Sequence, residues 1–135
     1  MALAAEVLGD KWTLLILREA FYGVQRFDDM LKDLGAPRAM LTDRLNKLIK
    51  HNLMTKEPYQ EPGDRVRYCY VLTEAGQALA PMFIALTEWG EDHIIEAEAP
   101  VKVVDKDTGK PLHISLCNEK GQPVATSKAT LVQRS

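Results

Sequence analysis

Apolar residues recur at helical spacing along the N-terminal part of the chain. In the segment 11–21 they share one helical face, at Trp12, Leu15, Ile16 and Ala20. Gly9 interrupts the short helix-favouring run 2–8, and Asp10 is a favoured N-cap residue. Gly23 is typical of a helix end. We therefore expect a helix over 11–21, preceded by a short helix over 2–8.

Two further helices are predicted next. The segment 26–34 places its apolar residues on one face, at Phe27, Met30, Leu31 and Leu34. Gly35 and Ala36 then break the helix, and Pro37 is well suited to the first position of a third helix over 37–51. In this third helix Leu41, Leu45 and Leu48 lie at i, i+4 and i+7, so we expect their shared face in the core.

The face opposite these leucines determines how the third helix is interpreted. At about 100° per residue, it carries mainly polar and basic residues, namely Ala39, Asp43, Asn46, Lys47 and Lys50. Arg38 stands at the helix start, and Arg44 flanks the apolar stripe. A closely spaced helix pair whose second member has a polar, basic outer face is typical of DNA recognition. The N-terminal half of such a helix reads base edges, while basic side chains contact phosphates.

A β-hairpin is predicted after these helices. The segment 53–57 favours a strand, and 58–64 is a loop rich in proline, glycine and acidic residues. The segment 65–72 then alternates, with Val66, Tyr68, Tyr70 and Leu72 on one face and Arg65, Arg67 and Cys69 on the other. Such a hairpin next to a recognition helix has the position of a wing.

A long final helix is expected to follow the hairpin. Thr73 favours its N-cap, the helix extends to about His93, and Pro81 within it predicts a kink. Its apolar stripe consists of Ala78, Met82, Ala85, Leu86, Trp89 and His93. The order of three helices, hairpin and helix predicts a mainly α fold with a β-hairpin wing, which is the winged helix-turn-helix plan.

The distribution of charge along the chain says more about nucleic-acid binding than the net charge does. The chain has a net charge of −2, which by itself argues against binding nucleic acid. The stretch 37–67, however, contains seven Lys and Arg against four Asp and Glu, a net +3, and the rest contains ten against fifteen, a net −5. A basic middle in an acidic protein is compatible with binding DNA through one face.

Other classes of function find little support in the sequence. No apolar run approaches the roughly 20 residues of a membrane span, and no N-terminal export signal is visible. Cys69 and Cys117 lie far apart and suggest no disulfide framework, which fits a reducing, cytoplasmic location. The three histidines are scattered, and no catalytic triad, paired acids or phosphate-binding loop is visible. We therefore predict no enzyme, no cofactor and no metal.

Several strings of residues resemble one family. They are Leu8–Glu19 (LGDKWTLLILRE), Gly23 with Arg26 and Phe27, Leu41–Leu45 (LTDRL), Leu72–Gly76 (LTEAG) and Glu88–Glu91 (EWGE). Across roughly residues 1–93 the chain resembles the HxlR family of bacterial winged-helix regulators. The resemblance implies transcription control, often in response to a small reactive molecule. It also implies a homodimer joined through the first and last helices, with both recognition helices in successive major grooves.

One family feature is missing from this chain. Many members carry a cysteine just before the first helix, and some of them use it to sense electrophiles or oxidants. The alignment places that position just upstream of Met1. Either the start is truncated, or this member senses nothing through that thiol.

The C-terminal segment contains an internal repeat. After a linker at 96–100, residues 105–112 (DKDTGKPL) match 117–124 (CNEKGQPV) at a period of 12. Each unit is a glycine turn between β-favouring runs, which we expect at 101–104, 112–116 and 129–132. The pattern resembles a zinc ribbon, with ligand positions that would be Asp105, Thr108, Cys117 and Lys120. Because only Cys117 could bind zinc as a thiolate, we expect a metal-free, β-rich extension over 96–135. The domain for DNA binding and dimerisation would cover 1–95.

These observations define two sets of predicted site residues. The predicted DNA-binding residues are Arg38, Ala39, Thr42, Asp43, Arg44, Asn46, Lys47, Lys50, Arg65 and Arg67. The predicted dimer interface comprises Ala2, Leu3, Ala5, Met82, Leu86 and Trp89. The main alternative is a winged helix used only for protein association, whose exposed third helix and wing would be apolar. A regulator similar to the MarR or ArsR families would change the family but not the chemistry.

Overall fold

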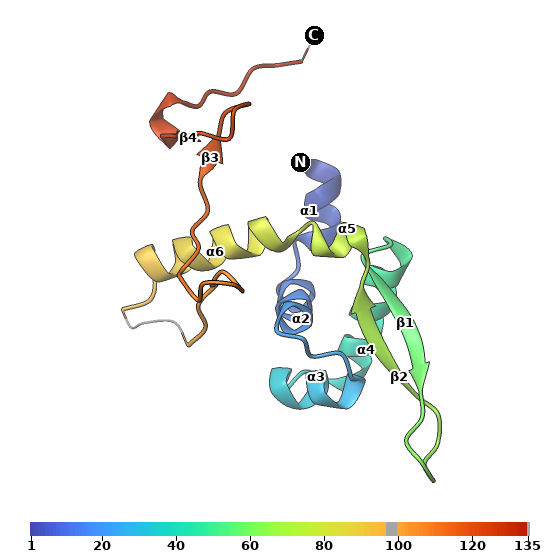
Figure 1. Ribbon diagram of the computed structural model, residues 1–135. Coiled ribbons are helices and arrows are strands. Elements are labelled where there is room, and N and C mark those ends of the chain that lie inside the picture. Colours follow the sequence, from blue (N-terminus) through green and yellow to red (C-terminus); the bar gives the residue numbers. More distant parts are fainter. Residues whose placement is uncertain (97–99, 135) are drawn as a thin grey trace. The chain divides into compact units, whose positions relative to one another are not determined.

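The computed structural model describes residues 1–96 and 100–134. These residues form two compact units, Met1–Ala80 and Pro81–Ser135 (Figure 1). The first unit contains helices α1 (Ala2–Leu8), α2 (Lys11–Phe21), α3 (Phe27–Leu34) and α4 (Arg38–Lys50), then strands β1 (Met54–Tyr59) and β2 (Arg67–Leu72), and the short helix α5 (Glu74–Gln77). The predicted mainly α fold with a hairpin wing is confirmed.

The core of the first unit lies where α2, α3, α4 and the hairpin meet. As predicted, Leu41, Leu45 and Leu48 of α4 are fully buried, each 0% exposed. They pack in a core whose other fully buried apolar side chains are Ile16, Leu17, Met30 and Met54. With this face of α4 committed to the core, its opposite face is left to solvent.

The buried face of α2 differs from the predicted one. The predicted stripe included Trp12 and Leu15, but the buried residues include Thr13 and Glu19 beside Ile16 and Leu17. Two polar residues can occupy this face because each has a partner: Thr13 donates from its backbone and hydroxyl to Asp10, and Glu19 accepts from Arg18 at 2.7 Å. Periodicity that counts only apolar residues therefore places the stripe on the wrong part of the helix.

Strands β1 and β2 form the predicted antiparallel hairpin, with Met54 opposite Leu72 and Tyr59 opposite Arg67. Figure 1 shows its tip projecting beyond the helices of the first unit. The boundaries differ from the prediction: β1 continues through Pro58, and Arg65 precedes β2. The segment before α3 also joins the hairpin, since Arg26 bridges to Cys69 and the Tyr70 amide donates to the Gln25 carbonyl at 2.8 Å.

The predicted kinked helix over 73–93 is wrong, because the structure has two helices there. Thr73 does cap the first, α5, accepting a hydrogen bond from the Gly76 amide at 3.1 Å. The helix α6 (Ala80–His93) then starts anew, with Pro81 in its first turn. Amide groups in the first turn of a helix have no acceptor within the helix, so a proline there costs no hydrogen bond. Pro81 is therefore compatible with the start of a new helix.

The second unit contains α6 and the C-terminal segment. Its short strands β3 (Leu116–Cys117) and β4 (Pro123–Val124) pair antiparallel, a 3-10 turn (Thr126–Lys128) follows, and Val104 bridges to Pro111. Both predicted glycine turns are present, with φ of 69° at Gly109 and 74° at Gly121. The expected β-runs at 101–104 and 129–132 form no strand, and of the run 112–116 only Leu116 lies in one. Of the predicted linker, residues 97–99 lie outside the described residues. The predicted division by role into 1–95 and 96–135 stays a prediction.

No helix in the described ranges combines the length and the apolar character that crossing a membrane requires.

Candidate nucleic-acid interface

The outward face of α4 carries the side chains that the sequence predicts for it. Ala39, Thr42, Asp43, Asn46 and Lys50 are exposed, and Lys47 is half-buried. Burial of the three leucines on the opposite face holds these side chains at the surface. The result is a polar helical surface with hydrogen-bonding groups in its first half and lysines in its second.

Arg38 lies at the start of α4 and is well exposed, with 67% of its side chain accessible. Its guanidinium lies over the Phe27 ring, 5.1 Å from the centroid, and 3.6 Å from an oxygen of Asp28. The Thr42 hydroxyl donates to the Arg38 carbonyl at 3.0 Å, one helical turn away. The aromatic ring and the carboxylate thus hold the Arg38 guanidinium at the exposed start of α4.

Asp28 connects α4 to the wing. One of its oxygens lies near Arg38, and the other lies 3.4 Å from Nη1 of Arg67 on β2. Arg67 also contacts Asp64 at 3.4 Å, while its buried Nε has no hydrogen-bond partner in the described part of the chain. Arg65 is exposed in the loop before β2. The fold therefore brings Arg38 and Arg67 to a shared anion on α3, although they belong to different elements.

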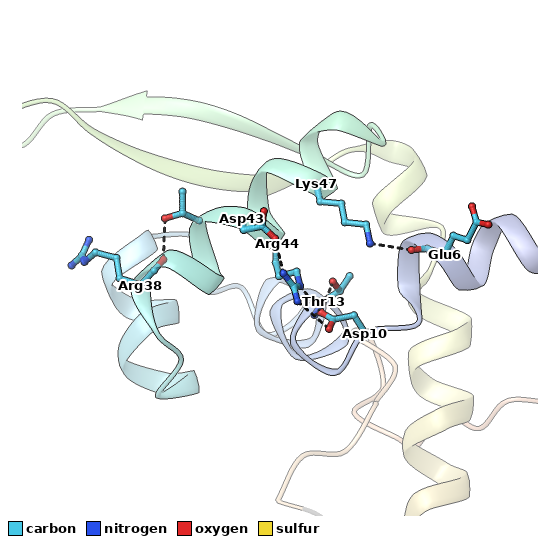
Figure 2. Close-up of polar contacts among 8 residues, drawn as sticks. Glu6, Asp10, Thr13, Arg38, Asp43, Arg44 and Lys47 are labelled. Atoms are coloured by element: carbon cyan, nitrogen blue, oxygen red, sulfur yellow. Dashed lines mark hydrogen bonds and ion pairs between the residues drawn. The ribbon is translucent and has the colours of Figure 1, made fainter.

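Arg44 occupies a different environment from the other predicted DNA contacts (Figure 2). Only 26% of its side chain is exposed, and its guanidinium donates to Asp10 at 2.8 Å and also to Asp43. Asp10 is at the same time the N-cap of α2, accepting from the Thr13 amide at 2.9 Å. The hydrogen bond from Arg44 is the main reason why the pKa of Asp10 falls to about 2, and the same contact raises the pKa of Arg44.

Lys47 reaches back toward the N-terminus of the chain (Figure 2). Its ammonium donates to the backbone carbonyl of Glu6 at 3.0 Å, in the last turn of α1. The final carbonyls of a helix have no helical partners and carry partial negative charge, so a lysine there is favourable. Arg44 and Lys47 thus fix the position of α4 against the elements before it.

Two basic residues near the wing were not predicted as site residues. Arg26 pairs with Glu61 at 2.8 Å and lies over the Tyr59 ring, and Lys56 lies 4.2 Å from the centre of the Tyr68 ring. Lys56 belongs to the basic stretch, and its place on a strand could have indicated a wing contact. Arg26 gives no such signal, because only the tertiary pairing of its segment with β2 brings it to the wing.

The predicted interface residues on α1 and α6 are exposed in the single chain. Neither helix contains a buried residue. Leu3 is 77% exposed, and Met82, Leu86 and Trp89 are 36%, 48% and 54% exposed. Apolar side chains left uncovered along one side of a helix are typical of surfaces that pack against another chain.

Comparison with known proteins decides the family. The HxlR-like helix-turn-helix family matches residues 7–98. The chain belongs to this family. It is accordingly a DNA-binding transcriptional regulator of the helix-turn-helix type. A Mycobacterium tuberculosis protein named as an uncharacterized HTH-type transcriptional regulator is 37% identical over 129 residues, covering 94% of this chain and 80% of that protein.

Solved structures of relatives share the fold of this HxlR-like chain. PA1607, proposed to be a transcription factor, superimposes with a TM-score of 0.82 at 32% identity, covering 96% of this chain and 91% of that one. The reduced form of the transcriptional regulator YodB from B. subtilis gives a TM-score of 0.61 at 26% identity, covering 73% and 95%. The match to PA1607 extends over the C-terminal segment, whereas the match to YodB covers a smaller part of the chain.

Proposed function

We propose that this HxlR-like chain acts as a homodimeric repressor or activator that recognises an operator sequence in double-stranded DNA. The observation that carries the proposal is the two-faced character of α4, with three leucines fully buried and a polar, cationic face in solvent. A surface of this kind matches the base edges and phosphates of a major groove. A module for protein association alone would present apolar residues on the same helix face.

The predicted contacts divide into two roles. Arg38, Thr42, Asp43 and Asn46, with Ala39 between them, would face base edges in the major groove. Lys50, Arg65 and Arg67 would contact phosphates or the adjacent minor groove. The ion pairs of Arg44 with Asp10 and Asp43 support a further role for it, in which it holds α4 at the correct angle. Lys47 would also help to hold α4, through its hydrogen bond to the Glu6 carbonyl of α1. A DNA phosphate would compete with that carbonyl for the Lys47 ammonium.

The exposed apolar faces of α1 and α6 support dimerisation. In a single chain, Leu3 on α1 and Leu86 and Trp89 on α6 are in contact with water, which is unfavourable for large apolar side chains. A second copy of the chain would bury these side chains. The dimer would then present two recognition helices to the two half-sites of one operator. A half-site spacing of about 34–36 Å, one turn of DNA, would follow from such symmetry.

An effector is the third part of the proposal. The structure of one relative, YodB, is that of its reduced form. This chain has two free cysteines, the half-buried Cys69 on β2 and the exposed Cys117. Cys69 lies on the strand that carries Arg67, so a change at this thiol would reach the wing directly.

Selection of bound sites from random duplexes, followed by sequencing, tests the proposal. We expect a two-fold symmetric motif to be enriched by the wild-type protein. Replacement of Arg38 or Asn46 by alanine should relax the preference at particular base pairs, each contact being worth about 1–3 kcal/mol. Replacement of Lys50 should leave the motif unchanged. Failure to enrich any motif would favour the association module instead.

A further inference from the structure

A cavity within the second unit lies between α6 and the segment 101–113. Its volume is about 320 Å³, at the lower end of the range of roughly 300–1,000 Å³ that small-molecule sites occupy. One wall is Ile84 on α6, and the facing wall includes Val103 and Leu112 of the C-terminal segment. The cavity therefore has apolar walls and a volume that can hold the body of a small organic molecule.

Acidic side chains outnumber basic ones around this cavity. Three carboxylates on α6 border it, from Glu88, Glu91 and Asp92, whereas the basic side chains at its edge are Lys102 and His113. Glu88 is engaged in holding the wall, since its oxygens accept from the Ile114 amide at 3.2 and 3.3 Å and lie near Nδ1 of His113. This contact fixes the C-terminal segment against α6.

The other two carboxylates are available to a ligand. Within residues 1–96 and 100–134, the side chains of Glu91 and Asp92 make no hydrogen bond or ion pair. Glu91 is half-buried and Asp92 is exposed, so both carboxylates can be reached from solvent. Three carboxylates against the single lysine Lys102 leave an excess of negative charge at the cavity, which would repel an anion.

We propose that this cavity binds an organic cation with an apolar or aromatic body. The apolar walls would cover the body, and Glu91 and Asp92 would balance the charge, an arrangement that selects cations over neutral and anionic molecules of the same shape. The proposed DNA interface does not include this site. Its existence does not depend on the proposed function, although its use as an effector site does.

Helix geometry connects the cavity to the predicted dimer interface. Ile84, Glu88 and Glu91 lie at i, i+4 and i+7 and line the cavity, while Met82, Leu86 and Trp89 form the exposed apolar stripe. The two sets are offset by two residues, or about 200°, so they occupy opposite sides of α6. A ligand that orders the C-terminal segment against one side would fix the helix that carries the other.

The experiment uses tetraphenylphosphonium and its anionic counterpart of the same shape, tetraphenylborate. By titration calorimetry on the full chain without DNA, we expect the cation to bind at one site per chain, at least tenfold more tightly than the anion. The double variant Glu91→Gln/Asp92→Asn should weaken cation binding at least tenfold. The matched variant Asp107→Asn/Glu119→Gln removes the same charge from exposed positions of the same unit and should bind like wild type.

Three results would overturn the proposal: equal affinity for both ions, no cation binding at millimolar concentration, or unchanged binding by the cavity variant. Thermal melting of each variant without ligand checks that it is folded. If the cavity variant alters the monomer–dimer equilibrium but not cation binding, the occupant is a basic side chain of a second copy, and the proposal is wrong. Duplex affinity is measured separately, so failure of the cation site and failure of the DNA-binding function are distinguishable.

Discussion

Asp10 interacts with two elements at once. Its carboxylate caps α2 through the Thr13 amide and pairs with Arg44 of α4, and these contacts lower its pKa from 3.8 to about 2. A lowered pKa in the folded state means that the ionised form stabilises the fold. This contribution is present above pH 3.8, the value for the unfolded chain, and is lost as the pH falls through about 2.

Two substitutions separate the contributions of Asp10. Asp10→Asn retains an N-cap but loses the ion pair, so we expect a loss of up to about 1 kcal/mol. Asp10→Ala loses both and should cost about 0.5–2 kcal/mol more. Urea denaturation at pH 7 measures these differences. Between pH 4 and pH 2 the wild type should lose more stability than Asp10→Asn, and parallel curves would contradict the assignment.

Gly76 is a position in the first unit where a side chain would clash with the backbone. A Cβ there would overlap the carbonyl oxygen of Leu53 and press on Leu72. We expect Gly76→Ala to destabilise the fold by about 1–3 kcal/mol. Gly90, inside α6, has open space around the same position, so Gly90→Ala should stabilise by up to about 1 kcal/mol. Thermal melting compares the two variants. Equal shifts in melting temperature would contradict a close approach between Gly76 and the Leu53 carbonyl.

At the scale of elements, α3 contacts two arginines of the proposed DNA-binding surface through Asp28. Its carboxylate pairs with both Arg38 and Arg67 and would also repel phosphate. Asp28→Asn should therefore raise the affinity for any duplex several-fold. The slope of log affinity against log salt should also become steeper by about one unit for each arginine released to contact a phosphate. Asp33→Asn, an exposed position on the same helix, is the control. Lower duplex affinity in Asp28→Asn would instead mean that Asp28 aligns the arginines for binding.

The sequence predicts elements better than it predicts their contacts. The spacing of Leu41, Leu45 and Leu48 was sufficient to orient α4, because one buried stripe determines both faces of a helix. Pro81 could not distinguish a kink from a new helix, since proline is compatible with both. The link from Asp28 to Arg38 and Arg67 depends on how α3, α4 and β2 pack, and no local pattern contains that information.

The C-terminal turns are predicted to fold without zinc. One oxygen of Asp105 already accepts from the amides of Asp107 and Thr108 at 2.8 and 2.9 Å, and Lys120 would place a positive charge at a ligand position. A structural zinc site needs four suitable donors, and its binding supplies folding energy. Metal analysis should return well under one zinc per chain, and a chelator should leave the melting temperature unchanged. Stoichiometric zinc whose removal unfolds the segment would refute this.

At the scale of the whole molecule, the exposed apolar faces predict self-association. Sedimentation at tens of micromolar should give a dimer for the wild type. Leu86→Glu/Trp89→Glu places two charges on the exposed face of α6 and should give a monomer with unchanged helix content. Thr87→Glu, on the cavity side of the same helix, should remain dimeric. A monomeric wild type would remove the basis for a two-fold symmetric operator.

Duplex affinity as a function of salt tests the central claim most directly. Fluorescence anisotropy would compare the selected duplex with a shuffled one for the wild type, Asn46→Ala, Lys50→Ala and Arg67→Ala. We expect the wild type to prefer the selected duplex by roughly 10³-fold or more, with log affinity falling linearly against log salt. Asn46→Ala should reduce the preference, whereas Lys50→Ala and Arg67→Ala should weaken both duplexes and flatten the slope. Equal affinity of the wild type for both duplexes, or unchanged affinity in Arg67→Ala at physiological salt, would contradict recognition through α4 and the wing.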